Sequence, residues 1–143
     1  MADTKVPEPV KSFVIDRLTW YRGHGSSASK LLREDGKMCC VGIYGRALGV
    51  PDAYLLNLGT VSNSLGEKDP YGPVPPPARN LPWPEWTIKR QHGDLSDLYT
   101  VNDYQLAMGG GGKWEGVINS EADREAVIAK LFAKNGITVT FIN

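Results

Sequence analysis

The chain has 143 residues, of which 41% are hydrophobic and 22% are charged. These proportions are ordinary for one folded domain and exclude a largely disordered chain, because enough apolar surface can be buried on folding. Lysine plus arginine equals aspartate plus glutamate at 16 each. The chain therefore lacks the net positive charge that would hold duplex nucleic acid or an anionic membrane.

The sequence divides into a short leader and one domain. Residues 1–10 contain two prolines and several charges without a hydrophobic period, so we expect a loose N-terminal leader followed by a single domain over 11–143. No apolar run reaches the roughly 18 residues of a membrane span, and the start lacks the pattern of a signal peptide. Cys39 and Cys40 are adjacent and poorly placed to form a disulfide with each other. These features predict a cytoplasmic protein.

The first predicted elements are two strands separated by a loop. Ser12–Ile15 is a short apolar run typical of a strand, and Asp16 offers a side-chain oxygen to cap a turn or short helix. Residues 23–29 are rich in glycine and serine and predict a loop. A second strand is predicted at residues 30–33, because the Asp35-Gly36 pair that follows is a strong signal for chain reversal.

The most apolar part of the chain, residues 38–48, is hydrophobic nearly all round and predicts a buried central helix. Gly49 and Pro51 follow it as the glycine and proline that commonly end a helix. Gly42 and Gly45 lie three residues apart on one side. We therefore expect another element to approach that side closely.

Seven of the ten prolines lie between Asp69 and Pro84. This stretch predicts a long extended loop, because proline is excluded from helix interiors and central strands. Trp83 and Trp86 lie at its end. Large aromatic side chains on such a segment indicate that it packs either on the body of the protein or on a partner.

Two further helices and a strand are predicted in the last third. Asp94 or Ser96 would cap a short helix that ends at Asn102-Asp103. Ser120 begins a capping box for a helix that extends to about Lys134, and β-branched and aromatic residues then alternate over 137–142 as in a strand.

These elements together predict an α+β fold. We expect a small antiparallel sheet, formed by the strands at Phe13, Leu31 and Ile137, to pack against two main helices at Met38 and Ser120, with a long proline-rich loop outside. A homo-oligomer is compatible with this fold, although no heptad or similar pattern specifies one.

The sequence contains no recognisable catalytic or metal-binding signature. A thiolate nucleophile would need a placed base, and a zinc site would need more ligands than Cys39 and Cys40 supply at this spacing. Cysteine in an apolar run is typically a small buried residue. We therefore assign no catalytic residue, metal ligand or cofactor, and an enzyme is the least favoured class.

Aromatic and polar residues suggest three places where a ligand would bind. Trp20 and Arg22 combine a face for stacking on a base with a guanidinium for a phosphate, but a core tryptophan beside a solvated arginine explains them equally well. Asn102 and Asp103 would bind a base edge, a ribose or a metal, or simply form a helix-ending turn. The candidate ligand-binding residues are Trp20, Arg22, Asn102, Asp103, Trp83 and Trp86.

Short motifs spread over most of the chain form a pattern that is similar to a known group of proteins. They are Ile15-Asp16-Arg17 to Trp20, the run from Leu31 to Gly42, Leu48-Gly49-Val50-Pro51, Asn102-Asp103, and Arg124-Glu125-Ala126 before a Gly-Ile-x-Val-x-Phe strand. With its DGxMCCxG core at Asp35–Gly42, the chain resembles a group of small phage and prophage accessory proteins. The resemblance implies a phage-type protein that acts in the cytoplasm of a host cell.

Two binding functions follow from this resemblance. In the first, the protein sequesters a small nucleotide-derived ligand, either a cyclic nucleotide or an NAD-derived immune signal, and so counters host defence. In the second, it is a stoichiometric inhibitor that binds a host or defence protein through an apolar patch. An enzyme that degrades such a signal is the third class. Neither duplex nucleic acid nor a membrane is an expected partner.

Overall fold

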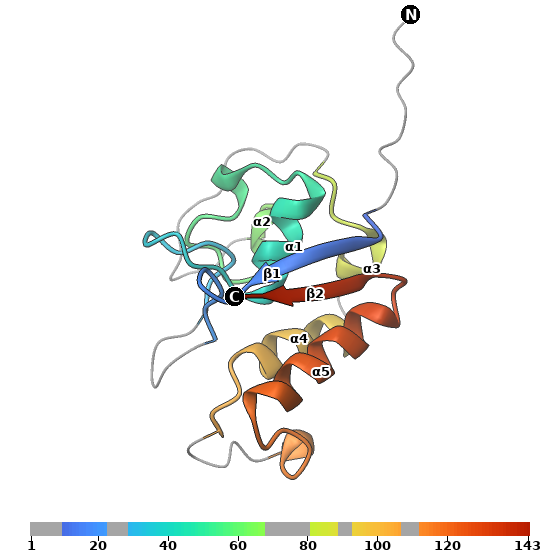
Figure 1. Cartoon of the computed structure of the whole chain (residues 1–143). Coiled ribbons are helices and arrows are strands. Elements are labelled where there is room, and N and C mark those ends of the chain that lie inside the picture. Colours follow the sequence, from blue (N-terminus) through green and yellow to red (C-terminus); the bar gives the residue numbers. More distant parts are fainter. Residues whose placement is uncertain (1–9, 23–28, 68–80, 89–92, 107–111) are drawn as a thin grey trace, which may run out of the picture.

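The computed structural model describes residues 10–22, 29–67, 81–88, 93–106 and 112–143, whose arrangement is shown in Figure 1. Their elements in chain order are β1 (Ser12–Asp16), α1 (Cys40–Leu48), the 3₁₀ helix η1 (Asp52–Tyr54), α2 (Val61–Ser64), α3 (Glu85–Ile88), α4 (Gly93–Asn102), the 3₁₀ helix η3 (Gly112–Trp114), α5 (Glu121–Ala133) and β2 (Thr138–Ile142). The described part of the chain is therefore mixed helix and strand. Its first and last elements are the two strands.

The sheet has two parallel strands, so the predicted antiparallel sheet is wrong. Ser12 is aligned with Thr138, and the Thr138 N–H donates to the Lys11 carbonyl at 2.8 Å. At the other end, the Arg17 N–H donates to the Ile142 carbonyl at 3.0 Å. Parallel pairing arises because the chain passes through all the helices before it returns, and α5 carries it back to the starting end of β1.

The segment at residues 30–33 does not form the predicted third strand of this sheet. Leu32 forms an isolated parallel bridge with Leu56, and the Leu31 N–H donates to the Leu58 carbonyl at 2.8 Å. Leu31 and Leu32 are both buried. Successive side chains of a strand point to opposite faces, so this segment is covered on both sides and lies within the core.

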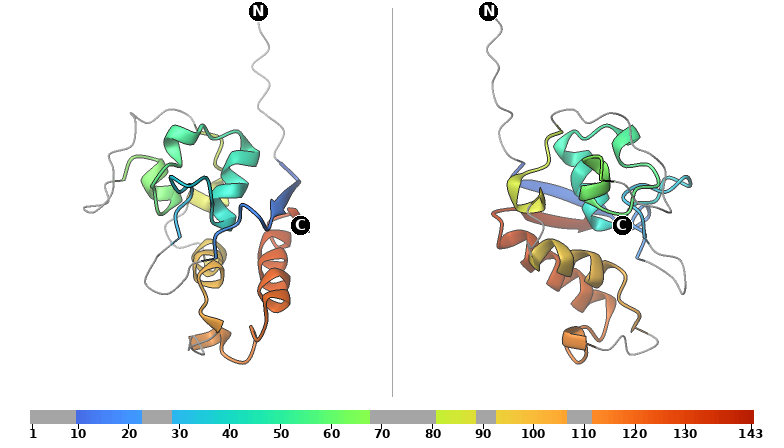
Figure 2. Two further views of the ribbon diagram at one scale, coloured as in Figure 1. Left: turned by 60° about the vertical axis from the view of Figure 1, so that its left-hand side comes forward. Right: turned by 180° about the vertical axis from the view of Figure 1, so that it is seen from behind.

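The helices lie on one face of the sheet. Phe13 of β1 points inward, and its ring centroid lies 5.2 Å from that of Tyr44 on α1 and 4.9 Å from that of Phe132 on α5. Such aromatic pairs add about 0.5–1.5 kcal/mol beyond the burial of their area. The two predicted main helices are α1 and α5, and a third long helix, α4, lies beside α5 (Figure 2).

Glycines let α1 pack closely, as the sequence predicted. A Cβ atom at Gly42 would lie 1.7 Å from the Leu31 carbonyl oxygen, and one at Gly45 would lie 2.4 Å from Cη2 of Trp83. Neither position has room for a larger residue. The helix ends at Gly49, whose φ of 96° is in the left-handed region that glycine adopts readily.

The predicted cap of α5 is also present, and ion pairs attach the helix to the N-terminal part of the chain. The Ser120 hydroxyl oxygen accepts the Asp123 N–H at 3.1 Å. Arg17, directly after β1, donates from Nε and Nη2 to the two carboxylate oxygens of Glu125 on α5, at 2.8 and 2.7 Å. Residues at opposite ends of the sequence are thereby held together.

Several predictions concern residues outside the described ranges. These are most of the leader at residues 1–10, the loop at 23–29 apart from Ser29, and the proline-rich stretch up to residue 80. Residues 81–84 are described and are not helical, in agreement with the prediction. In the ranges that the structure describes, no helix is long and apolar enough to cross a membrane.

Candidate ligand pocket at the end of helix α4

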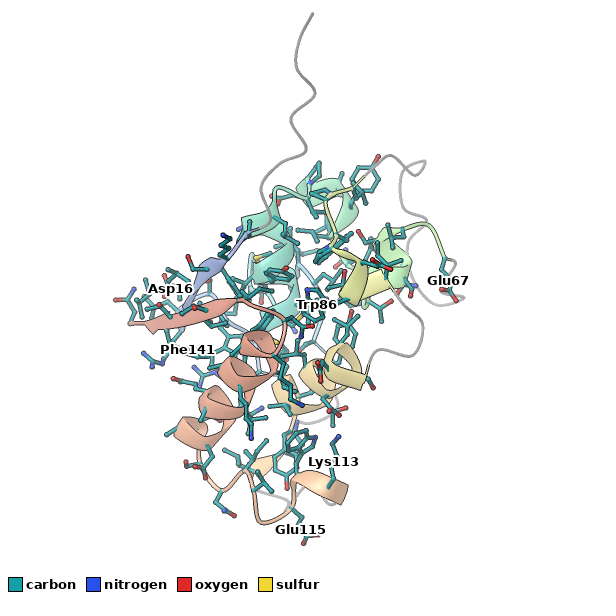
Figure 3. All side chains as sticks on the ribbon, turned by 90° about the vertical axis from the view of Figure 1, so that its right-hand side faces the viewer. Asp16, Glu67, Trp86, Lys113, Glu115 and Phe141 are labelled. Carbon is teal, nitrogen blue, oxygen red and sulfur yellow. The ribbon has the colours of Figure 1, made fainter. Side chains whose placement is uncertain are left out.

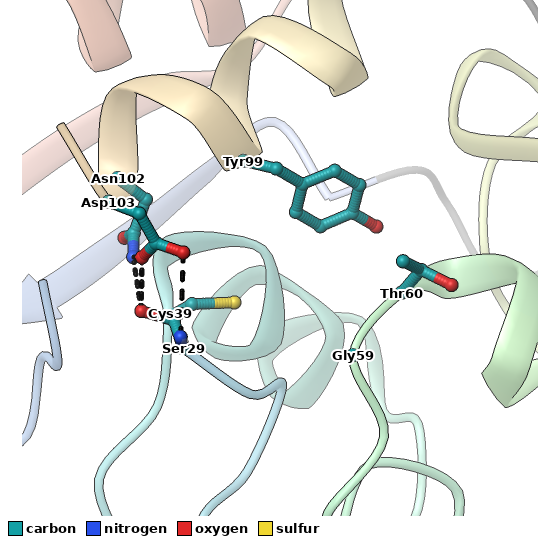
Figure 4. Close-up of a pocket in the computed structure, with 7 residues that line it drawn as sticks. All are labelled: Ser29, Cys39, Gly59, Thr60, Tyr99, Asn102 and Asp103. Carbon is teal, nitrogen blue, oxygen red and sulfur yellow. Dashed lines mark hydrogen bonds between the residues drawn. The ribbon is translucent and has the colours of Figure 1, made fainter. Parts of the chain in front are cut away.

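A small cavity lies where the C-terminal end of α4 meets the N-terminal end of α1 (Figure 4). It has a volume of about 160 Å³ and is lined by Ser29, Cys39, Gly59, Thr60, Tyr99, Asn102 and Asp103. We call it the inner cavity. A wider outer hollow of about 410 Å³ is lined by Tyr99, Thr100, Asp103, Tyr104 and Gln105. Tyr99 and Asp103 belong to both.

Asn102 is a buried hydrogen-bonding centre with an exposed fraction of 1%. Its Oδ1 accepts the indole N–H of Trp20 at 2.7 Å and the backbone N–H of Cys40 at 3.0 Å. Its Nδ2 lies 3.0 Å from both the Tyr21 carbonyl and the Ser29 hydroxyl oxygen. The amide therefore uses its donor and acceptor capacity within the protein, joining α4 to α1 and to the segment after β1.

Asp103 differs from Asn102 because part of the hydrogen-bond acceptor capacity of its carboxylate is unused. Its Oδ1 accepts the Ser29 hydroxyl in a short hydrogen bond and the Asn102 Nδ2 at 2.9 Å. Its Oδ2 has a single long contact, 3.4 Å from the Ser29 nitrogen. No lysine, arginine or histidine of the described ranges forms an ion pair with it. Oδ2 thus retains acceptor capacity at the cavity.

Tyr99 forms a flat wall of the inner cavity. Its ring spans the space between Asp103 at one end and Thr60 at the other (Figure 4). The Tyr99 Oη accepts the Val61 N–H at 2.9 Å. Burial raises the pKa of Tyr99, so the hydroxyl stays protonated, and its O–H has no acceptor among the described residues.

The two cysteines are buried and protonated. Cys39 precedes α1 as its cap, and its sulfur accepts the Gly42 N–H at 3.4 Å. Burial raises the pKa of the Cys39 thiol to about 12, with a smaller contribution from the charge of Asp103, and burial also raises that of Cys40. A thiol in this state is a poor nucleophile and metal ligand. Among the described residues no three acidic, cysteine or histidine side chains gather as a metal site would require.

Trp20 and Arg22 lie next to this site, with their side chains already in contact with the protein. Trp20 is buried against Asn102, and its ring centroid is 5.5 Å from that of Phe141. The Arg22 guanidinium carbon lies 4.3 Å from the Trp20 ring centroid, and Nη1 lies 2.9 Å from Glu121 Oε2. The structure therefore brings four predicted ligand-binding residues together. Stacking on a base by Trp20 remains a prediction.

Trp83 and Trp86 lie apart from that group and pack on the body of the protein. The Trp83 indole N–H donates to the Ser64 hydroxyl at 3.0 Å. The Trp86 ring centroid is 5.7 Å from that of Tyr44 and 5.9 Å from that of Phe132, within the layer of side chains between helices and sheet (Figure 3). Of the two alternatives for this segment, packing on the body is the one seen. A role in ligand binding for either tryptophan remains a prediction.

Arg124 of α5 holds the end of α4 in place, and sequence reasoning did not single it out for this role. The side chain is buried, and its Nη1 donates to the carbonyls of Val101 at 2.9 Å and Asn102 at 2.7 Å. Its Nη2 donates to the Tyr104 carbonyl at 2.6 Å. Nε lies 3.0 Å from Glu121 Oε2 as an ion pair but lacks hydrogen-bond geometry. Arg124 thus satisfies carbonyls that a helix end leaves unpaired.

Other residues that line the inner cavity were also missed, namely Tyr99, Gly59 and Thr60. Tyr99 is four residues before Asp103, and this spacing places both side chains on the same side of a helix, a signal that could have identified it. Gly59 and Thr60 reach the cavity from a distant loop, and no local pattern in the sequence marks them. Ser29 lies at the end of the predicted glycine- and serine-rich loop at residues 23–29.

Comparison of the chain with protein-family models, with curated proteins and with solved structures finds no match. The resemblance to small phage accessory proteins is therefore untested by these comparisons.

Proposed function

We propose that this protein is a non-enzymatic binding protein that sequesters a small nucleotide-derived ligand in the pocket at the end of α4. The observation that carries the proposal is Asp103 Oδ2, which faces the cavity with acceptor capacity and without a cationic partner in the described ranges. Ligand sites are typically apolar cavities with a few polar groups that fix orientation. A carboxylate oxygen with remaining acceptor capacity in such a cavity favours a ligand with a hydrogen-bond donor.

The shape of the pocket supports a ligand of nucleotide size. The flat ring of Tyr99 offers a surface for a base, and Asp103 offers an acceptor for a base amino group or a ribose hydroxyl. The inner cavity of about 160 Å³ is too small for a whole nucleotide, because sites for larger ligands measure about 300–1,000 Å³. The outer hollow of about 410 Å³ shares Tyr99 and Asp103 and supplies the remaining room.

Binding without turnover is favoured by the state of the nearby groups. The thiol of Cys39 is protonated because its pKa is raised by burial, and the Ser29 hydroxyl is engaged with Asp103. In our proposal the ligand is held and released unchanged. The DGxMCCxG core supports placing this activity in the cytoplasm of a host cell, where removal of an immune signal would counter defence.

A second candidate function, binding to another protein, is supported by apolar side chains on the sheet. The open face of the sheet carries two exposed apolar side chains, Val14 at 49% and Ile142 at 41%. Such a face would suit an inhibitor that binds a host or defence protein. It is the alternative to be tested if no small molecule binds.

The test is a thermal-stability screen with cyclic nucleotides and cyclic ADP-ribose, followed by denaturation and recovery of the bound compound. A ligand at a hundred times its Kd adds about 2.7 kcal/mol of stability, so a true binder is readily seen. Asp103→Ala should abolish the shift, and the control Val14→Glu on the opposite face should retain it. Recovery of intact compound supports sequestration, whereas a chemically altered compound would identify an enzyme.

A further inference from the structure

We infer that the inner cavity selects an aromatic base that carries an exocyclic amino group, as adenine and cytosine do. This inference rests on the proposed function and narrows its ligand class. It follows from counting which polar groups of the cavity the protein has left unused.

Most polar groups around the cavity are occupied within the protein. The Asn102 amide is saturated, and the Ser29 hydroxyl donates to Asp103 and accepts from Asn102. The Thr60 hydroxyl lies 3.0 Å from Asn63 Oδ1 and accepts the Asn63 N–H at 3.2 Å. Two strong groups are left among the described residues, Asp103 Oδ2 as an acceptor and the Tyr99 O–H as a donor.

A matching ligand must supply a donor to Asp103 and an acceptor to Tyr99. Asp103 lies toward one end of the Tyr99 ring, and the Tyr99 hydroxyl is at the other end, toward Thr60 (Figure 4). The ligand's donor and acceptor therefore belong on different parts of one rigid group. A flat ring also uses the aromatic wall. The volume of about 160 Å³ suits a base alone, which leaves the sugar and phosphates for the outer hollow.

The carboxylate distinguishes amino bases from keto bases. An amino group donates an N–H to Asp103, just as the amino group of cytosine donates to carboxylates in nucleic-acid recognition. A keto oxygen at the same place would set two acceptors against each other and leave Oδ2 with only its long contact to the Ser29 nitrogen. Because Oδ1 already accepts from Ser29 and Asn102, a single oxygen remains open. One open oxygen suits one amino N–H better than the paired N–H donors of guanine.

The experiment compares two pairs of nucleosides that differ by one group, adenosine with inosine and cytidine with uridine. Calorimetric titration of the wild-type protein should show at least about tenfold tighter binding of the amino member in at least one pair, the size expected for a hydrogen bond to a charged group. Asp103→Asn, whose amide can donate to a keto oxygen, should remove or invert that preference. Asp52→Asn, the same change at an exposed aspartate, should leave it unchanged.

The outcomes separate this inference from the proposed function. Equal affinity for both members of each pair would overturn the base selection and leave sequestration standing. Failure of every nucleoside and cyclic nucleotide to bind would overturn both. Stabilisation by putrescine in preference to any nucleoside would show that Asp103 serves an ammonium ligand and would also reject the inference. Because the wild-type comparison is decisive alone, it holds even if Asp103→Asn fails to fold.

Discussion

Asn102 and Asp103 are neighbours in the chain, yet the structure uses them in opposite ways. The Asn102 amide is buried and bonded on every side, to the Trp20 indole and the Cys40 N–H among others. The Asp103 carboxylate turns one oxygen to a cavity and has no cationic partner in the described part of the chain. The comparison teaches that a polar group whose hydrogen-bonding capacity is filled by the protein stabilises the fold, whereas a group with remaining capacity is available to a ligand.

The largest expected effect comes from Asn102→Ala. It leaves the Trp20 indole N–H and the Cys40 N–H buried without an acceptor, so we expect a loss of about 3–5 kcal/mol in the free energy of unfolding. Urea unfolding followed by tryptophan fluorescence measures it. Asn102→Asp keeps an acceptor and serves as the partial control. A loss below about 1 kcal/mol for Asn102→Ala would remove the structural half of the comparison.

Arg124→Met tests how much the hydrogen bonds from Arg124 to the carbonyls at the end of α4 contribute to stability. The variant retains apolar volume but leaves the Val101, Asn102 and Tyr104 carbonyls without their guanidinium donors, which we expect to cost about 2–3 kcal/mol. Urea unfolding again provides the value. Arg124→Lys keeps the charge without the planar fork. If lysine restores full stability, the arrangement of donors at Arg124 is unimportant.

The pH dependence of stability tests the buried thiols. Unfolded cysteine loses its proton near pH 9, whereas folded Cys39 keeps its own up to about pH 12. Stability is therefore complete below pH 9 and falls as pH rises toward 12, by up to about 1.4 kcal/mol per pH unit for each such thiol. Urea midpoints between pH 8 and about 10.5 measure the slope. Cys39→Ala should make the slope shallower, and an unchanged slope would contradict the protonated state.

The smallest expected change in stability is that of Asp103→Ala. Its carboxylate accepts from the Ser29 hydroxyl and the Asn102 amide, but the site is half-buried and water can replace these contacts. We therefore expect a loss of about 1 kcal/mol in urea unfolding, together with complete loss of ligand binding. A large loss of binding with a small loss of stability would assign Asp103 to the ligand and not to the fold. If Asp103→Ala destabilises the protein as much as Asn102→Ala, Asp103 is structural and the comparison fails.

Local signals in the sequence predicted the three long helices, α1, α4 and α5, but not the short helices α2 and α3. The Ser120 cap and the Gly49 end of α1 were identified because each depends on a few neighbouring residues. The central helix begins two residues later than predicted, at Cys40, because the Cys39 sulfur caps it and leaves Met38 outside. Hydrophobic pattern alone does not reveal such a cap.

Contacts between residues far apart in the chain could not be predicted from such local signals. The direction of the sheet depends on how the chain crosses the whole molecule, and the apolar run at Leu31 resembled a strand although it is buried on both sides. Asn102 and Asp103 were placed correctly at a helix end. Which of them is saturated depends on Trp20 and Cys40, which are 82 and 62 positions away.

The parallel pairing of the first and last strands has a consequence for synthesis on the ribosome. β1 leaves the exit tunnel early, but its partner in the register, Thr138 opposite Ser12, is made 126 residues later (138 − 12). At about 5–20 residues per second this interval is roughly ten seconds, during which Phe13 and Ile15 have no sheet to join. Such distant pairing also slows folding once the chain is released. The nascent chain therefore exposes an aggregation-prone segment until its final strand emerges.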